Sequence, residues 1–190
     1  MKTLKPFLVF VSLFPLGTAH GQSDSKSKFT VEPIYGIETA LVQYPGPARY
    51  KTRATYGARA LYGVTLLSGE LEYTTSTSRD DYPALDQVVT DKVERANLGL
   101  RSTISIGKYI GFYFRAGGSA SQGKTTIKTA GVEETKDRAL TINPYGGAGL
   151  QVAFASNLAI NAGVTMIRNS ESEYDAQYTL GLSARFGTVR

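Results

Sequence analysis

Strict alternation of apolar and polar side chains is the feature of this sequence that most limits its fold. It is clearest in Tyr174–Phe186, where the even-numbered positions are aromatic or aliphatic and the odd-numbered ones are polar or glycine. A side-chain period of two is typical of a β-strand with one apolar face. Aromatic residues stand at both ends of that face with aliphatic residues between them, which is the order expected of a strand that faces lipid.

Seven earlier segments repeat the pattern. The eight predicted strands run over Phe29–Val42, Tyr50–Leu66, Glu70–Ser76, Ala96–Ile106, Ile110–Ser119, Leu140–Phe154, Leu158–Met166 and Tyr174–Phe186. Because proline cannot donate a hydrogen bond to a sheet, we expect a bulge or a strand end near Pro33 and near Pro144. No segment has the 3.6-residue period of an amphipathic helix.

The connections between these segments alternate in length. Short turns are predicted at Leu67–Glu70, Gly107–Lys108 and Ser156–Asn157. Longer polar connections are predicted at Tyr44–Pro47, Ser78–Lys92, Gln122–Asp137 and Asn169–Glu173. An even strand count with short turns at one end and long loops at the other is typical of an outer-membrane barrel whose two chain ends lie in the periplasm.

The charged residues of the segments gather on the polar face, and we predict that they form a charge network in the barrel lumen. The members of this predicted network are Glu32, Glu38, Arg53, Arg59, Glu72, Arg95, Arg101, Arg115, Asp175 and Arg185, and Glu70 shares their face. A secreted water-soluble barrel of the lipocalin or avidin type would instead have apolar residues inside and polar ones outside. Alternation alone does not distinguish the two, so the loop asymmetry favours the membrane barrel.

The span from Phe29 to Phe186 resembles the small eight-stranded outer-membrane barrels of the OmpA/OmpX type. The resemblance rests on the strand pattern, the topology and the closing aromatic Phe186, although four residues follow it where the family pattern ends on the aromatic. It implies an all-β, eight-stranded antiparallel up-and-down transmembrane β-barrel. It also implies that Phe186 helps the barrel-assembly machinery recognise the chain, and that outer-membrane lipid and lipopolysaccharide surround the barrel.

The first 21 residues are predicted to be a cleaved signal peptide. Lys2 and Lys5 precede the apolar run Pro6–Leu16, and small residues allow cleavage after Ala19 or after Gly21. A polar lead (22–28), the barrel (29–186) and a short tail (187–190) would follow. The run is well short of the roughly 20 residues that a membrane-spanning helix needs.

The residue inventory argues against an enzyme. The only histidine is His20 and there is no cysteine, so a serine or threonine nucleophile would lack the usual base, and thiolate metal sites are excluded. We therefore predict a non-enzymatic, monomeric protein without a cofactor, acting in envelope integrity or in surface interaction. A narrow porin and a soluble ligand-binding barrel remain the alternatives. The net charge of +5 is too small and scattered to indicate nucleic-acid binding.

Three local motifs have weaker functional interpretations. Gly118–Thr125 matches the phosphate-binding pattern G-x-x-x-x-G-K-[ST], but β-branched residues follow it where a helix would be needed. The acidic residues Asp80, Asp81, Asp86 and Asp91 fit a solvated loop better than a divalent-cation site. Candidates for contact with lipopolysaccharide are Arg49, Lys51, Lys124, Lys128 and Lys136.

Overall fold

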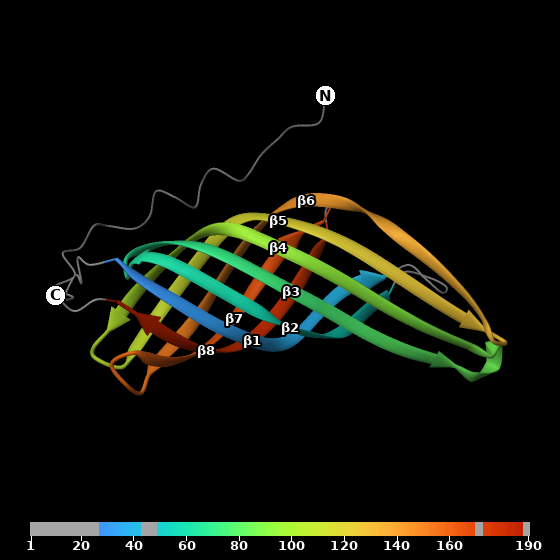
Figure 1. Cartoon of the computed structure of the whole chain (residues 1–190), viewed down its shortest axis with the longest axis horizontal. Helices are drawn as coiled ribbons and strands as arrows, with labels where there is room; N and C mark the ends of the chain where they lie inside the picture. Colours follow the sequence, from blue (N-terminus) through green and yellow to red (C-terminus); the bar gives the residue numbers. More distant parts are fainter. Residues whose placement is uncertain (1–26, 43–48, 170–172, 188–190) are drawn as a thin grey trace, which may run out of the picture.

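Eight antiparallel strands form a closed barrel in the computed structural model, which describes residues 27–42, 49–169 and 173–187. The strands are β1 (Lys28–Val42), β2 (Arg49–Val64), β3 (Leu67–Tyr82), β4 (Gln87–Ile106), β5 (Ile110–Thr129), β6 (Val132–Ala153), β7 (Leu158–Arg168) and β8 (Tyr174–Phe186). Each strand pairs with the next along the chain, and β1 closes the ring against β8 with Phe29 opposite Phe186 (Figure 1). The predicted fold class and strand order are confirmed.

The only helical element among the described residues is the 3₁₀ turn η1 (Pro83–Leu85). None of the helical structure in these ranges is long or apolar enough to span a membrane. The predicted signal peptide, the cleavage positions and most of the polar lead and tail lie outside the described residues.

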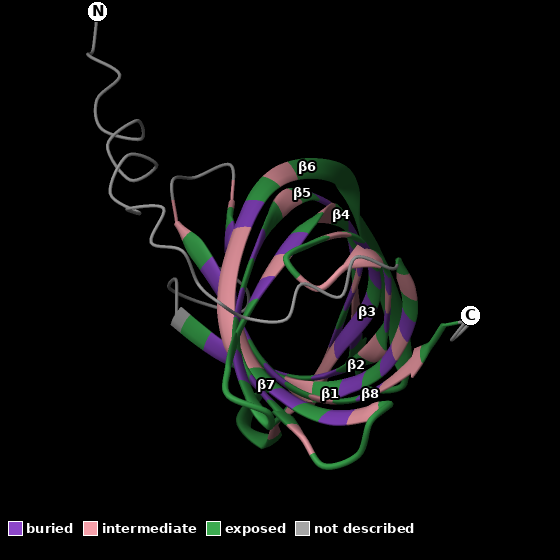
Figure 2. Cartoon of the chain, turned by 90° about the vertical axis from the view of Figure 1, so that its left-hand side faces the viewer, coloured by how far each residue is buried: buried purple, intermediate pink, exposed green. Residues whose placement is uncertain are grey.

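The two faces of the wall are opposite in character to those of a soluble barrel. Along β8, Leu180 is 61% exposed and Leu182 is 47% exposed, whereas Gln177 and Ser183 are almost fully buried. Buried and exposed residues alternate along the strands around the ring, except in the first half of β6, where residues 132–142 are all exposed (Figure 2). Large apolar side chains therefore cover the outside, and polar and charged ones fill the inside.

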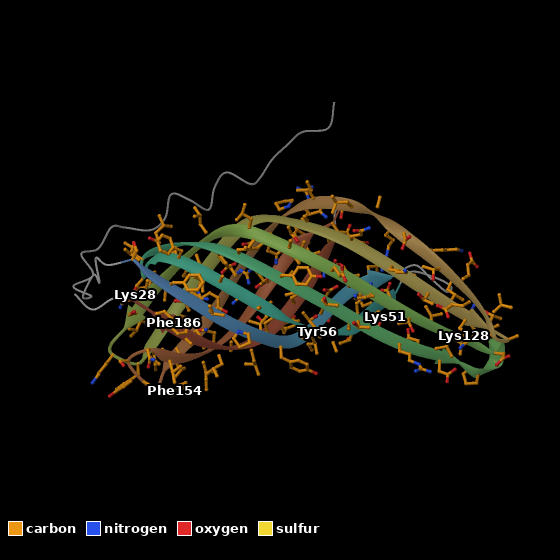
Figure 3. The ribbon with its side chains drawn as sticks, in the orientation of Figure 1. Lys28, Lys51, Tyr56, Lys128, Phe154 and Phe186 are labelled. Carbon is orange, nitrogen blue, oxygen red and sulfur yellow. The ribbon has the colours of Figure 1, made fainter. Side chains whose placement is uncertain are left out.

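The apolar outer surface is a belt with clear limits. At the end with the short turns it is bounded by aromatic residues such as Phe154 and Phe186 (Figure 3). At the other end the first charged outward-facing side chains are Glu94 and Lys92 on β4, and Lys124 on β5. Between these limits no described outward-facing residue carries a charge. A continuous apolar band of this kind is what the roughly 25 Å hydrophobic zone of an outer-membrane barrel requires.

Strands β3 to β6 extend far beyond this belt, which corrects two predicted loops. The stretches 78–92 and 122–137 were expected to be long polar connections, but they continue the strands. Only η1 with Asp86 separates β3 from β4, and only Ala130 and Gly131 separate β5 from β6. This part lies outside the apolar belt, so its outward face is polar and its composition suggests a loop. Its Thr, Val and Ile residues nevertheless favour a strand.

The extension is a four-stranded sheet with two open edges. Pairing of β2 with β3 ends at Ala54 and Thr77, and pairing of β6 with β7 starts only at Tyr145. The tips of the β3–β4 and β5–β6 hairpins consequently form the far right-hand end of the molecule in Figure 1. Strands β4, β5 and β6 have 20, 20 and 22 residues, about twice the 9–11 needed to cross a bilayer.

The first short turn and the two prolines also differ from expectation. The turn between β2 and β3 consists of Thr65 and Leu66, so β3 already starts at Leu67. Pro33 causes no register shift against β2; instead the pairing of β1 with β8 is interrupted at that point. Pro144 pairs with Gly118, and the register shift lies a few residues away, between Ser121 and Gly123. Pro144 is tolerated because it lies just where β6 becomes an edge strand.

The Gly118–Thr125 motif lies within β5, so no helix follows it to bind phosphate and the nucleotide interpretation is excluded.

We predict that the apolar belt is intolerant of charge. Leu182→Arg should lower the free energy of unfolding in lipid by about 2–4 kcal/mol, because the guanidinium would face the acyl chains. The matched control is Thr126→Arg, which lies on the outward face above the belt and should be close to neutral. Urea unfolding in lipid vesicles measures both. Equal tolerance of the two changes would contradict a lipid-facing belt.

Candidate functional site

Two groups of ion pairs lie in the lumen, and the group nearer the short turns is centred on Arg59. The Arg59 guanidinium donates from Nη1 to Glu32 at 2.8 Å and from Nε to Glu72 at 2.7 Å. A third carboxylate, that of Glu70, lies 3.6 Å from Nε. Arg59 is only 1% exposed, so its charge is neutralised almost entirely by these neighbours rather than by water.

Arg115 joins the same carboxylates from the opposite wall. It lies 2.6 Å from Glu70 and donates to Glu72 at 2.8 Å. The ring of Tyr145 lies 4.9 Å from its guanidinium carbon, and the Tyr145 hydroxyl donates to Glu70 at 3.2 Å. These contacts connect β1, β2 and β3 on one wall with β5 and β6 on the other.

Arg101 lies nearer the short turns than this group, and its hydrogen bonds are longer. It donates to Glu32 at 3.2 Å and to Asn161 at 3.5 Å, the longest hydrogen bonds that a lumen arginine makes among the described residues. The ring of Tyr113 lies flat against it, 3.7 Å from the guanidinium carbon. Such contact stabilises a cation through the negative face of the ring.

Tyr113 fits in the lumen only because glycines face it. A Cβ atom at Gly163 would lie 2.1 Å from the Tyr113 hydroxyl oxygen, and one at Gly149 would lie 2.4 Å from it. Tyr145 similarly occupies the space above Gly99. The lumen glycines therefore make room for the two aromatic rings that complete the packing.

The second group of ion pairs lies nearer the extension and is centred on Glu38. This carboxylate accepts hydrogen bonds from Arg53 at 2.7 Å, from Ser76 at 2.7 Å and from Gln177 at 3.0 Å, and it pairs with Arg95. Arg95 continues to Asp175 at 2.7 Å. Because an eight-stranded barrel is only wide enough for side chains to fill, these pairs leave no continuous water path at this level.

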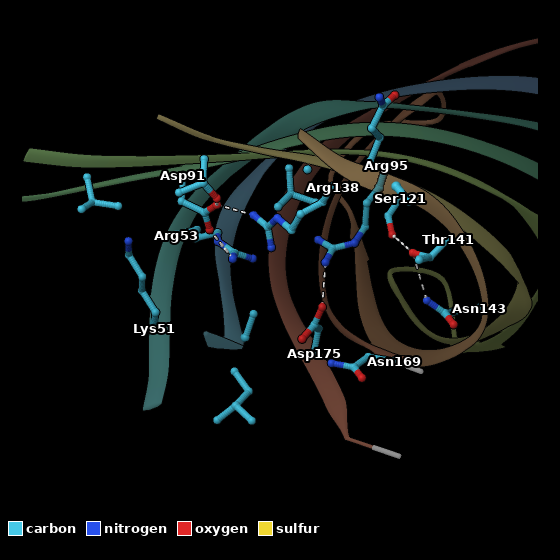
Figure 4. A pocket seen from close by; sticks show the side chains of 18 residues that line it. Lys51, Arg53, Asp91, Arg95, Ser121, Arg138, Thr141, Asn143, Asn169 and Asp175 are labelled. Carbon is cyan, nitrogen blue, oxygen red and sulfur yellow. Dashed lines mark hydrogen bonds and ion pairs between the residues drawn. The ribbon is translucent and has the colours of Figure 1, made fainter. Parts of the chain in front are cut away.

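A cavity of about 370 Å³ opens above Glu38, at the mouth that the extension surrounds (Figure 4). Asp91 lies at its wall, pairs with both Arg53 and Arg138, and accepts a hydrogen bond from Thr125 at 2.9 Å. Burial alone would raise the pKa of the Asp91 carboxyl, but the two guanidinium groups outweigh burial and hold that pKa below its usual value. Lys51 also lines the cavity and pairs with Asp80 at 2.6 Å.

Nine of the ten predicted network residues thus lie inside the lumen, five in the Arg59 group and four in the Glu38 group. The tenth, Arg185, lies at the short-turn end, where it donates to Gln151 at 2.7 Å.

Sequence reasoning missed Asp91 and Arg138 as network members, because Asp91 falls in the stretch 78–92 that was assigned to a loop and Arg138 lies between the predicted loop 122–137 and the predicted strand from Leu140. The solvated-loop interpretation of Asp91 is wrong, since that residue is 2% exposed. The alternation in β4 could have identified Asp91 as a lumen residue. Asp91, Arg95 and Asn97 all have odd numbers, so they lie on the same face of the strand. Lys51, expected at the outer surface, also faces inward.

Comparison with known proteins supports the fold alone. The sequence matches no protein-family model and no curated protein sequence. Among solved structures it is similar to Ail, the attachment invasion locus protein of Yersinia pestis, with 16% identity, a TM-score of 0.57, and coverage of 85% of this chain and 98% of Ail. Neisserial surface protein A has 13% identity, a TM-score of 0.53, and coverage of 84% and 97%. The N-terminal barrel of Pseudomonas aeruginosa OprF has 16% identity, a TM-score of 0.53, and coverage of 83% and 97%.

The chain therefore has the fold of the small eight-stranded outer-membrane β-barrels of the OmpA/OmpX type, as the sequence analysis predicted.

We predict that Arg59 is the most sensitive position of the network. Arg59→Ala should lower the free energy of unfolding by about 3–5 kcal/mol, because it leaves three buried carboxylates short of a cation. The control is Lys92→Ala, which removes an exposed ion pair with Glu94 and should have no measurable effect. Unfolding midpoints in detergent or lipid measure both, and an Arg59→Ala barrel as stable as the unmodified one would show that the lumen pairs do not stabilise the fold.

Proposed function

We propose that this protein is a non-enzymatic integral outer-membrane barrel that acts in envelope integrity or in surface interaction. The observation that carries the proposal is the division of side chains, with an uncharged apolar belt outside and buried charges that form ion pairs inside. That division is stable only if lipid, rather than water, surrounds the wall. The orientation is the reverse of the one that a soluble ligand-binding barrel requires.

The extension of β3 to β6 is the part that we assign to surface interaction. It lies on the opposite side of the belt from the short turns, so it faces the outside of the cell if the short turns are periplasmic. By analogy of fold alone, the names of two neighbours support this assignment, since one is an attachment invasion protein and the other a surface protein.

Absence of catalysis is part of the proposal. The described residues include no histidine, and Glu32 and Glu38 are both tied to arginines in the lumen. A carboxylate held in this way is poorly placed to accept and release protons during a reaction. We likewise propose no cofactor, no nucleic-acid partner and a monomeric state.

Outer-leaflet lipopolysaccharide is the proposed neighbour of the outer wall above the belt. Lys124 and Lys128 face outward there. Lys51 and Lys136 are less suitable, because Lys51 faces the lumen and Lys136 pairs with Glu134 at 3.3 Å. The side chain of Arg49 lies outside the described residues.

Phe186 is the proposed signal for the barrel-assembly machinery. It ends β8 on the outward face, 57% exposed, opposite Phe29 at the seam that closes the barrel.

The orientation can be tested with single cysteines, because the chain has none of its own. Ala84→Cys places a thiol at the tip of the β3–β4 hairpin, and Lys108→Cys places one in the short β4–β5 turn. A membrane-impermeant maleimide should label the first variant on intact cells and the second only after lysis. Labelling of Lys108→Cys on intact cells would mean the opposite orientation, and labelling of neither would mean that the chain does not reach the surface.

The choice between a plugged barrel and a narrow porin can be tested by conductance. We expect little or no steady current from the unmodified protein in planar bilayers, because the Glu38 and Arg59 groups block the lumen at two levels. Removing both central charges of the upper level, in Glu38→Ala with Arg95→Ala, should make brief openings more frequent. A stable, well-resolved channel in the unmodified protein would favour the porin instead.

A further inference from the structure

We propose that the Arg138 side chain is a releasable link that attaches the free edge of the extension to the barrel and so fixes the direction in which the extension projects. Arg138 lies on β6 and pairs with Asp91 on β4, two strands away. Both residues line the cavity of about 370 Å³, and Figure 4 shows the Arg138 guanidinium directed at the Asp91 carboxylate. We call Arg138, Asp91 and Arg53 the edge link.

The outer part of β6 has only one neighbouring strand among the described residues. It pairs with β5 along its length, but its pairing with β7 starts only at Tyr145. Residues 132–142 are all exposed. Main-chain hydrogen bonds therefore hold this edge through β5 alone, and a side chain that reaches past β5 adds an independent attachment.

The β-bulge between β5 and β6 turns Arg138 toward the inside. Ser121 pairs with Thr141, and the next pair is Gly123 with Arg138. Two residues of β6 thus lie opposite one residue of β5 at this point. Nearer the short turns the odd-numbered residues of β6 face the lumen, as Tyr145 does. The extra residue reverses this alternation, so the even-numbered Arg138 faces inward, and redirecting a side chain is a common role of bulges.

Gly123 provides the path of the Arg138 side chain across β5. It is the direct neighbour of Arg138 in the sheet. A Cβ atom at position 123 would lie 2.5 Å from Arg138 Nε and 2.7 Å from Arg138 Cζ. The guanidinium therefore lies over the glycine and reaches the strand beyond it, and any larger residue at position 123 would displace it.

Asp91 connects this edge to the barrel wall. It is 2% exposed, and it pairs with Arg53 on β2 as well as with Arg138. The other open edge of the extension is attached to β2 in a similar way, by the ion pair of Lys51 with Asp80 at 2.6 Å. Ion pairs thus join both edges of the projecting sheet to the same strand of the barrel.

The two cations that hold Asp91 differ in exposure, and this difference makes the edge link releasable. Arg53 is 2% exposed, whereas the Arg138 side chain is 46% exposed. When Arg138 moves into water, Asp91 keeps Arg53, so no buried charge is left without a partner. A half-exposed ion pair is also weakened by salt far more than a buried one. The link therefore has a closed state and a released state that differ little in energy.

The consequence for recognition rests on the proposed function, which assigns the extension to surface interaction. An extension held in one direction loses less conformational entropy on binding a partner than a loosely attached one. The link itself depends neither on a partner nor on which end of the barrel faces outward. Its failure is therefore distinguishable from failure of the proposed function.

The test is a distance measurement by double electron–electron resonance on the purified full-length protein in nanodiscs. Spin labels at Glu133→Cys on β6 and at Thr52→Cys on β2, both exposed positions, report where the edge lies relative to the wall. With no other change we expect one narrow distance distribution. Arg138→Ala should give a broader distribution with a longer mean, because the edge is then free to move away from the mouth.

A second substitution tests the path across β5. Gly123→Ala should produce the same change as Arg138→Ala, because its methyl group displaces the guanidinium. Adding Gly123→Ala to Arg138→Ala should produce no further change. The matched control is Lys124→Ala, which removes an outward-facing cation from the same part of the sheet and should leave the distribution unchanged.

Salt tests the link without any substitution in it. About 1 M sodium chloride, which screens charges beyond about 3 Å, should broaden the distribution in the protein that retains Arg138 and leave that of Arg138→Ala unchanged. A distribution that is the same with and without Arg138, or one that salt does not alter when Arg138 is present, would overturn the proposal.

Discussion

Pairing of charges inside a narrow lumen is the constraint on which the rest of this structure depends. The key pairs are also direct neighbours in the sheet, since Glu32 lies opposite Arg59, Glu38 opposite Arg53, and Arg59 opposite Glu72. A slip of one residue between β1 and β2 would turn these charges toward the lipid and the apolar side chains toward the lumen. The ion pairs and the apolar belt therefore fix the same register, and each would be costly without the other.

Packing in the lumen follows from the same confinement. Long arginine side chains need space, and glycines on facing strands provide it, while Tyr113 and Tyr145 fill what remains. The result resembles a protein core built from polar groups, in which each buried charge has several partners. A barrel filled in this way is rigid and closed along most of its length, so binding or recognition must occur at its two mouths or on the projecting sheet.

Much of this architecture could be predicted from the sequence, because period-two alternation fixes which side chains share a face. Strand number, topology and the inward direction of Glu38 or Arg59 followed from that pattern. The extension of strands β3 to β6 beyond the apolar belt did not follow from it. Beyond the belt the outward face becomes polar, as at Thr90 and Thr126, while the inner face mixes apolar Val89 with charged Asp91. The strand then loses the alternation of the belt and has the composition of a loop. The pairing of Asp91 with Arg138 required coordinates, since it depends on the register across the β5–β6 bulge.

The central claim is that lipid contacts the outer wall, and the absence of tryptophan from the chain allows a direct test. Single tryptophans would be placed at Leu182 in the belt and at Ala84 at the hairpin tip, and their fluorescence measured in vesicles with and without brominated lipid. We expect strong quenching at position 182 and none at position 84. Fluorescence at position 182 that bromine leaves unchanged would contradict the account, because the belt would then not face the bilayer.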